Sequence, residues 1–251
     1  MLIDTHCHLH DREFFTAEQA EEMLKRARQK NVQKIICIGT SHEDSLRAAE
    51  FASEHKDVYW TYGVHPEYCK EGFEYNLSGS PVAIGEVGLD YHYDGYNREA
   101  QIRLFEKMLQ LASDNNLPVS FHVREAFEDF FPVVANFPKI RGVVHSFSDN
   151  KKNLKRILTE TDFYVGVNGM ATYSTLPTPP LERILLETDA PFLTPVPFRG
   201  IINECGYIYE IAQWLSDKLA VDFDQIERET TRNAEKLFKF ECTGVQEKRN
   251  D

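Results

Sequence analysis

The sequence lacks the features that mark several large classes of protein. Across its 251 residues no apolar run approaches the roughly 20 residues needed to cross a bilayer, so we expect no membrane partner. The first residues contain no basic segment followed by an apolar one, and without such a secretory signal a cytoplasmic protein is the expectation. No Gly-x-Gly-x-x-Gly motif follows an early strand-like segment, which argues against a dinucleotide-binding open sheet.

Cysteine pairs with the spacing of metal ligands are also absent. The five cysteines are odd in number, widely scattered, and include no Cys-x-x-Cys pair. This pattern argues against both a disulfide framework and a thiolate zinc site. We expect reduced thiols, buried in the case of Cys7 and Cys37, which lie within strand-like segments.

Positive charge is scarce, with 28 Lys and Arg against 40 Asp and Glu and a net charge of −12. Such a protein repels polyanions at long range, which counts against a protein that coats DNA. It does not count against an enzyme whose bound metals neutralise a phosphate. Nothing in the composition fixes an oligomeric state, and a monomer is compatible with it.

What the sequence contains is an alternation of strand-like and helix-like segments. The clearest helix spans 98–115, where Ile102, Phe105 and Leu109 share one face. The pattern predicts an α/β protein, a single (β/α) eight-stranded TIM barrel that takes up residues 1–251 as one domain. An open doubly wound sheet is the alternative. The eight strand-like segments are 2–8, 34–39, 58–63, 82–86, 118–122, 142–145, 163–167 and 183–188.

Three parts of the chain should depart from a regular barrel. Pro132 lies inside the helix-like segment 125–136, so we expect a kinked or split helix there. The proline-rich run 175–180 leaves little room for a regular helix, which predicts a shortened seventh crossover. The last dozen residues are polar and are expected to be loose.

Metal-competent side chains fall at the ends of the predicted strands. Side chains alternate along a strand, so His6 and His8 project from the same face. The carboxyl ends of parallel barrel strands form one rim, where barrel enzymes place their chemistry. We therefore predict one metal site from the six residues that end strands one, four, five, six and eight: His6, His8, Glu86, His122, His145 and Asp189.

Four imidazoles and two carboxylates exceed the three protein ligands of a usual mononuclear catalytic zinc, and they suit two divalent metal ions. Glu86 is the most economical bridge between the two ions, which would activate a water together. Asp189 is a ligand with a second plausible task, as the general base that takes the proton of that water. Because imidazole and carboxylate prefer different metals, zinc, magnesium and manganese all stay open.

Several segments carry a family resemblance that covers nearly the whole chain. The chain resembles the TatD family of metal-dependent deoxyribonucleases, within the amidohydrolase-like barrel enzymes. The matching segments are Asp4-Thr5-His6-Cys7-His8-Leu9, Gly63-Val64-His65-Pro66, Ile84-Gly85-Glu86-Val87-Gly88-Leu89-Asp90-Tyr91, His122-Val123-Arg124, His145-Ser146-Phe147-Ser148, Leu186-Glu187-Thr188-Asp189-Ala190-Pro191-Phe192-Leu193-Thr194-Pro195, Arg199-Gly200, Asn203-Glu204 and Asn233-Ala234.

The resemblance implies that His6, His8, Glu86 and Asp189 surround one metal and that Glu86, His122 and His145 surround the other. It implies hydrolysis of phosphodiester bonds in DNA, chiefly from a 3′ end, with Asp189 and Glu86 as catalytic residues. The expected substrate-binding residues are His65, Arg124, Tyr91 and Arg199. Arg124 and His65 are candidates for the substrate phosphate, although a loop histidine packed against Pro66 explains His65 equally well.

Other positions depart from the family pattern. Ile201 and Ile202 stand where the family often has basic residues. Together with the net charge of −12 and the proline-rich crossover, they favour short or single-stranded DNA ends over long duplexes as substrate. Two alternatives are a metal-dependent hydrolase of another small phosphoester or cyclic amide, and a non-catalytic, metal-containing binding protein.

Overall fold

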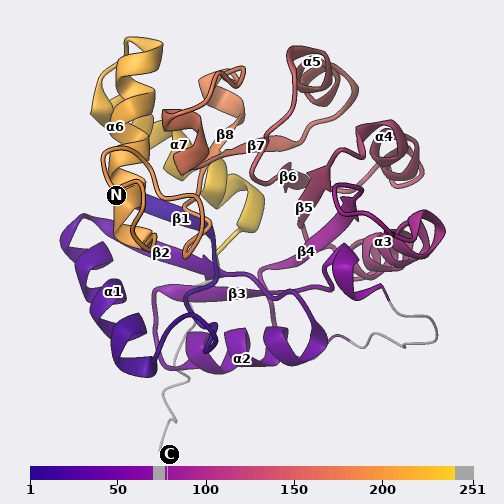
Figure 1. Cartoon of the computed structure of the whole chain (residues 1–251), viewed down its shortest axis with the longest axis horizontal. Helices are drawn as coiled ribbons and strands as arrows, with labels where there is room; N and C mark the ends of the chain where they lie inside the picture. The colour runs from indigo at the N-terminus through magenta and orange to yellow at the C-terminus, as the bar shows by residue number, and fades with distance from the viewer. Residues whose placement is uncertain (70–76, 78, 241–251) are drawn as a thin grey trace, which may run out of the picture.

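Eight parallel strands form a nearly closed barrel in the computed structural model, which describes residues 1–69, 77 and 79–240 (Figure 1). Each strand pairs with the next one in the chain, from β1 to β8. The ends of this series meet, because the Asp189 amide donates to the His6 carbonyl at 2.8 Å and the Thr5 hydroxyl donates to the Leu186 carbonyl. The strands are β1 Leu2–Cys7, β2 Val32–Cys37, β3 Val58–Tyr62, β4 Ala83–Asp90, β5 Val119–Arg124, β6 Gly142–Val144, β7 Tyr164–Val167 and β8 Ile184–Leu186.

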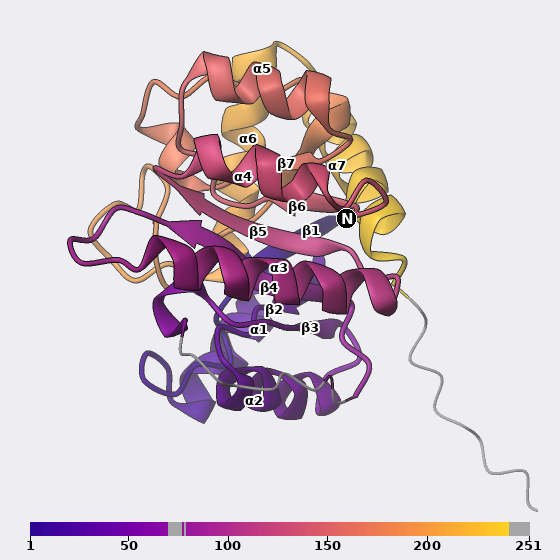
Figure 2. The same ribbon diagram turned by 90° about the vertical axis from the view of Figure 1, so that its right-hand side faces the viewer.

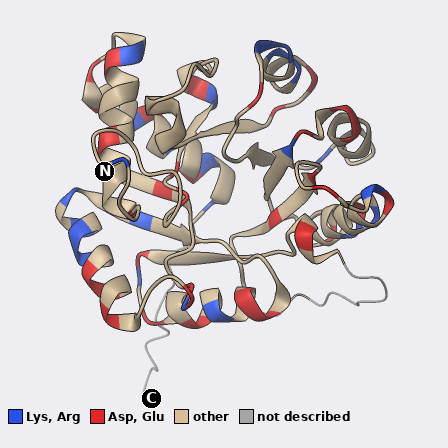
Figure 3. Ribbon diagram, viewed as in Figure 1, with Lys and Arg blue, Asp and Glu red and all other residues tan. Residues whose placement is uncertain are grey.

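Helices surround the strands, as the two perpendicular views show (Figures 1 and 2). Most Lys and Arg residues lie on these outer helices (Figure 3). The first helix begins at a capping box, in which Thr16 and Gln19 satisfy each other's backbone amides. The α-helices are α1 Ala17–Gln29, α2 His42–Ser53, α3 Arg98–Asp114, α4 Phe127–Ala135, α5 Lys151–Glu160, α6 Ile208–Leu219 and α7 Phe223–Phe238, and short 3-10 helices are η1 Pro66–Tyr68, η2 Gly169–Thr172, η3 Leu181–Arg183 and η4 Cys205–Tyr207.

The last helix closes the end of the barrel where the strands begin. The Thr231 hydroxyl on α7 donates to the Met1 carbonyl, and the Asn233 amide donates to the Ile184 carbonyl. Arg141, just before β6, reaches the Leu237 carbonyl at the other end of the same helix. Helix α7 therefore covers the end of the barrel at which the strands begin.

Apolar side chains fill the space between the strands and the surrounding helices. Phe121 on β5 packs edge-on against Phe105 of α3 and Phe130 of α4, and all three are fully buried. Buried aromatic rings of this size dominate the apolar area that folding removes from water. Within the described residues, no helix is long and apolar enough to span a membrane.

The structure confirms the predicted α/β architecture of eight parallel strands and corrects two details. Glu86 and His122 lie within β4 and β5 rather than at their ends, because both strands continue to Asp90 and Arg124 and pair there. Helix α4 is not split, since it runs through Pro132. The connection from β7 to β8 contains η2 and η3, and residues 241–251 of the predicted loose end lie outside the described part of the chain.

Candidate active site

A cavity of about 680 Å³ opens at the carboxyl ends of the strands. Its charged lining residues lie on β4 and β5 or on segments that directly follow strands. His8, Glu86, His122, His145 and Asp189 all line it, and His6 lies behind them, fully buried. The structure thus brings together the six residues predicted as one metal site.

Glu86 is the carboxylate on which these histidines converge. Its Oε1 lies 2.6 Å from Nδ1 of His122 and 3.1 Å from Nε2 of His145. Its Oε2 lies 3.4 Å from Nε2 of His6 and 4.0 Å from Nε2 of His8. The two oxygens therefore face two different pairs of imidazoles.

Asp189 completes one of the two groups. Its Oδ1 lies 3.5 Å from Nε2 of His8 and 3.6 Å from Nε2 of His6. Asp189 has a φ of +58°, a left-handed conformation that few residues other than glycine adopt, although aspartate tolerates it better than most. Two hydrogen bonds fix the neighbouring Thr188. Its amide and its hydroxyl both donate to the buried carboxylate of Asp4 on β1, at 2.9 Å and 2.6 Å.

Burial and charge act in opposite directions on these groups. Burial raises the pKa of Glu86 and of Asp189, but the surrounding histidines outweigh it and hold both pKa values below the usual range. Burial lowers the pKa of His8, yet the hydrogen bond to Asp189 and the charges of Asp189 and Glu86 raise it to about 9. Both carboxylates are therefore ionised at neutral pH.

The chemistry of these donors fits a divalent metal ion. Nε2 of His6 is buried without a hydrogen-bond partner, although it points between two carboxylates. Such an atom is costly to bury unless something occupies its lone pair. Three overlapping sets each place their ligand atoms within 4.8 Å of one another, and these sets are His6, His8 and Glu86, then His6, His145 and Asp189, then Glu86, His122 and His145.

Comparisons with known proteins agree with this geometry. The profile of a family described as TatD related DNase matches residues 3–239. The chain belongs to the TatD family. It is 33% identical to the uncharacterized metal-dependent hydrolase YabD of Bacillus subtilis, over 96% of this chain and 100% of YabD.

Other TatD relatives show the same extent of similarity. The 3′-5′ ssDNA/RNA exonuclease TatD of Erwinia tasmaniensis is 32% identical, over 89% of this chain and 95% of that protein. The crystal structure of YjjV, a TatD homologue from Escherichia coli, superposes with a TM-score of 0.82 and 28% identity, over 96% of this chain and 98% of YjjV. The chain is therefore a metal-dependent hydrolase of the TatD family.

The four predicted substrate-binding residues of this TatD protein divide into two pairs. His65 and Arg124 line the cavity, and the Nε2 atom of His65 lies 3.8 Å from Oε1 of Glu86. Tyr91 and Arg199 do not line it. The Tyr91 hydroxyl donates to Asp129 at 2.8 Å, and the Arg199 guanidinium stacks on Tyr173 at 3.7 Å.

Sequence reasoning missed two carboxylates behind the TatD histidines. Asp90 Oδ2 lies 2.8 Å from Nε2 of His122, and Glu187 Oε1 lies 3.4 Å from Nδ1 of His145. For Asp90 the available signal was its distance of four residues from Glu86, because residues that far apart share one face of a strand. For Glu187 the available signal was its position directly after the apolar run of β8.

The cavity mouth also has aromatic residues. Phe14, Tyr68, Tyr93 and Phe192 line it, and each is about half exposed, between 44% and 55%. Phe14 and Phe192 meet edge to face, with ring centroids 5.1 Å apart. Arg124 stacks over Tyr93 at 5.3 Å.

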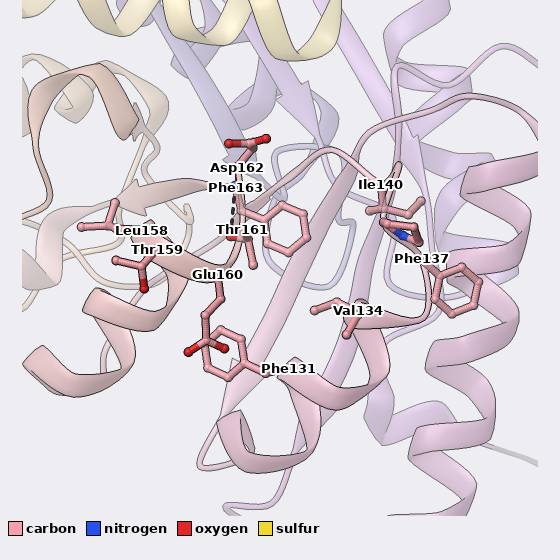
Figure 4. A pocket seen from close by; sticks show the side chains of 12 residues that line it. Phe131, Val134, Phe137, Ile140, Leu158, Thr159, Glu160, Thr161, Asp162 and Phe163 are labelled. Atoms are coloured by element: carbon pink, nitrogen blue, oxygen red, sulfur yellow. Dashed lines mark hydrogen bonds between the residues drawn. The ribbon is translucent and has the colours of Figure 1, made fainter.

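A second cavity, of about 490 Å³, lies between α4 and α5 near the amino ends of β6 and β7 (Figure 4). Its wall is formed largely by apolar side chains, with Glu160 and Asp162 as the titratable groups among the residues that line it. Among the described residues that line it there is no histidine or cysteine, and its loop residues lie just before β6 and β7, at the other ends of these strands from the TatD site. It therefore offers no catalytic set.

Proposed function

We propose that this protein hydrolyses phosphodiester bonds in DNA, removing nucleotides from the 3′ end of short or single-stranded chains with the help of two divalent metal ions. The observation that carries the proposal is the position of Glu86, whose two oxygens each face a separate pair of histidines. A carboxylate in that position suits a bridge between two cations, and paired cations are typical of enzymes that cleave phosphodiesters.

One metal ion would be held by His6, His8, Glu86 and Asp189, and the other by Glu86, His122 and His145. When bound, these ions acidify a water molecule and neutralise negative charge on the phosphate. Asp189 acts beside them as the general base. It is ionised because its pKa is lowered, despite burial, by the hydrogen bond to His8, and it faces the cavity where the attacking water must lie.

The substrate phosphate contacts Arg124 and His65, which line the cavity and can donate hydrogen bonds. A base at the end of the chain stacks on the half-exposed rings of Phe14 and Phe192 at the mouth. The 3′ polarity rests on the resemblance to relatives such as the 3′-5′ ssDNA/RNA exonuclease of Erwinia tasmaniensis.

Acidic residues at the mouth favour a short or flexible substrate. Asp11, Glu13 and Glu67 line the cavity, whereas Arg124 is its single Lys or Arg among the described residues. Ile201 and Ile202 are exposed at 55% and 58% and add no positive charge nearby. A long duplex would place many phosphates against this surface, and a short single strand places few. Two predictions from the sequence are not tested by these observations. One is that Tyr91 and Arg199 contact the substrate, and the other is that the crossover after β7 is shorter than in relatives.

The same acidic mouth supports a second candidate, a hydrolase of a small phosphoester, for which only one phosphate has to enter. A direct comparison separates the two. Purified protein is incubated with 3′-labelled and 5′-labelled single-stranded DNA, and in parallel with small phosphoesters and cyclic amides, in magnesium, manganese or zinc and with a chelator. Metal-dependent, stepwise loss from the 3′ end supports the proposal. If a small ester is hydrolysed while DNA stays intact with every metal, the second candidate replaces the nuclease proposal.

A further inference from the structure

Two of the four histidines in the site have a second carboxylate, which lies beside the ring nitrogen that does not face Glu86. His122 presents Nδ1 to Glu86 at 2.6 Å, while its other nitrogen, Nε2, lies 2.8 Å from Oδ2 of Asp90. His145 presents Nε2 to Glu86 at 3.1 Å, while its Nδ1 lies 3.4 Å from Oε1 of Glu187. Both imidazoles of one proposed metal position are thus placed between an inner and an outer carboxylate.

The other two histidines have no such partner within the described part of the chain. The second nitrogen of His6, Nδ1, lies 3.3 Å from the neutral hydroxyl of Ser120. The carboxylates near His8, Glu86 and Asp189, both approach its Nε2 atom. Both metal positions contain two histidines and share Glu86. They differ because only the histidines of one position have a carboxylate beside their second ring nitrogen.

The two outer carboxylates are fixed in place. Asp90 is 4% exposed, its Oδ1 accepts the His92 amide at 2.9 Å, and its backbone amide and carbonyl both bond to the buried side chain of Gln101. Glu187 is fully buried, and its Oε1 accepts the Ser146 amide at 2.6 Å and the Asn168 side-chain amide at 3.3 Å. Neither side chain is free to turn away from its histidine.

The Glu187 carboxylate packs directly against the backbone of Gly166, where a side chain would collide with it. A Cβ atom on Gly166 would lie 2.3 Å from Oε2 of Glu187. That Oε2 atom is buried without a hydrogen-bond partner. A buried carboxylate with an unpaired oxygen costs free energy, so its presence behind His145 calls for a compensating positive charge or a function.

We propose that Asp90 and Glu187 are positioning residues for the metal position formed by Glu86, His122 and His145, and that they set the metal affinity of this position alone. Asp90 accepts the Nε2–H of His122, and Glu187 places its charge 3.4 Å from Nδ1 of His145, an atom without a hydrogen-bond partner. Each outer carboxylate thereby favours the tautomer in which the opposite nitrogen carries the lone pair, and it increases the basicity of that nitrogen. The inference rests on the metal-binding part of the proposed function and does not depend on the substrate.

Zinc binding to the metal-free protein tests this inference without any activity assay. Zinc is titrated in competition with a chromophoric chelator, in the wild type and in the isosteric variants Asp90→Asn and Glu187→Gln. We expect the wild type to take up two equivalents. In each variant we expect one equivalent to bind as in the wild type and the other to bind about 10 to 100 times more weakly, as is usual when a carboxylate behind a ligating histidine is removed.

Asp44→Asn is the matched control. Asp44 is also a buried carboxylate that pairs with a histidine, since its Oδ1 lies 3.1 Å from Nε2 of His10, but His10 belongs to neither ligand set. This variant should bind both equivalents as the wild type does, even where its thermal stability is lower. Loss of zinc in Asp44→Asn as large as in Asp90→Asn would mean that folding defects cause the loss, and it would overturn the inference.

Asp189→Asn identifies which position is affected, because Asp189 belongs to the other one. This single variant should keep the zinc held by His122 and His145, and adding Asp90→Asn should weaken that remaining zinc. If Asp90→Asn and Glu187→Gln both bind two zinc ions as tightly as the wild type, the inference is also overturned. The nuclease proposal is unaffected by that result if the protein still cuts DNA. A protein that shows the expected zinc losses but cuts no DNA would refute the nuclease proposal and leave this inference standing.

Discussion

The imidazole rings of His6 and His145 are stacked, with centroids 3.6 Å apart and planes 11° from parallel. His6 comes from β1 and His145 directly follows β6, so the contact joins residues far apart in the chain. One ring belongs to each of the two proposed metal positions. The positions are thus adjacent, and the protonation of one ring disfavours that of the other.

The stability of the metal-free protein should fall as the pH rises from about 6.5 to above 9. Burial lowers the pKa of His122, but hydrogen bonds to Asp90 and Glu86 raise it to about 9, and the pKa of His8 is also raised to about 9. A histidine whose pKa is raised on folding stabilises the protein fully below its unfolded pKa of about 6.5, and this stabilisation is lost as the pH passes the folded value. Each of the two contributes on the order of 3 kcal/mol.

Thermal unfolding between pH 6 and 10 checks this prediction, with the chelator-treated and the zinc-loaded protein side by side. Zinc needs deprotonated ligands, so the gain in melting temperature that zinc gives should grow over the same range in which the metal-free protein becomes less stable. A metal-free melting temperature that is flat or rises between pH 6.5 and 9 would contradict the assignment of these two histidines as charged in the metal-free state.

Asp189→Asn should reduce hydrolysis by about 10² to 10⁴-fold, the usual contribution of a general base. The fold should survive, because the amide of residue 189 still donates to the His6 carbonyl and Thr188 still bonds to Asp4. Single-turnover rates on a short DNA strand, together with circular dichroism, give the measurement. A folded variant with a near-normal rate would show that another group accepts the proton.

Arg124→Gln should raise KM for a DNA oligonucleotide about 10- to 100-fold and change kcat little, since a hydrogen bond from a charged group contributes about 1.5 to 3 kcal/mol. Arg124 lines the cavity, whereas Arg156 lies on the outer helix α5, where it pairs with Glu160. Arg156→Gln is therefore the matched control, with an expected change in KM of less than about twofold. If the two variants behave alike, Arg124 has no special contact with the phosphate.

Phe14→Ala should weaken the binding of an oligonucleotide by about 1 to 3 kcal/mol if a base stacks at the mouth. The ring is 44% exposed and meets Phe192 edge to face, so its loss removes little of the core. The measurement is fluorescence anisotropy with a labelled strand and with the same strand made abasic at its 3′ end. The abasic strand should be insensitive to the change. An equal loss for both strands would exclude stacking at that position.

The barrel and the six converging residues could be predicted from the sequence because each leaves a local signal. An apolar run followed by histidine or carboxylate marks the ends of β1, β6 and β8, and strand order follows from the alternation with helices. The lengths of β4 and β5 could not be predicted in the same way. Glu86, Asp90 and His122 interrupt the apolar pattern there, and only their contacts across the two strands show why a strand tolerates them.

The buried contacts behind the site were also beyond the reach of the sequence. His10 looks like a loop residue, yet it is 1% exposed and pairs with Asp44 of α2. Glu187 and His145 are far apart in sequence and meet only because β6, β7 and β8 are neighbours. Pairings of this kind depend on the closed order of strands, and local residue patterns do not record it.

The central claim, that Glu86 is shared between two metal ions, is tested most directly by the Glu86→Gln variant. Metal content after dialysis and hydrolysis of a 3′-labelled single strand are measured on the same preparation, with the fold checked by circular dichroism. We expect a folded protein that has lost both metal ions, or holds both at least tenfold more weakly, and that leaves the strand intact. A folded Glu86→Gln protein that keeps two metal ions and cuts DNA at the wild-type rate would contradict it.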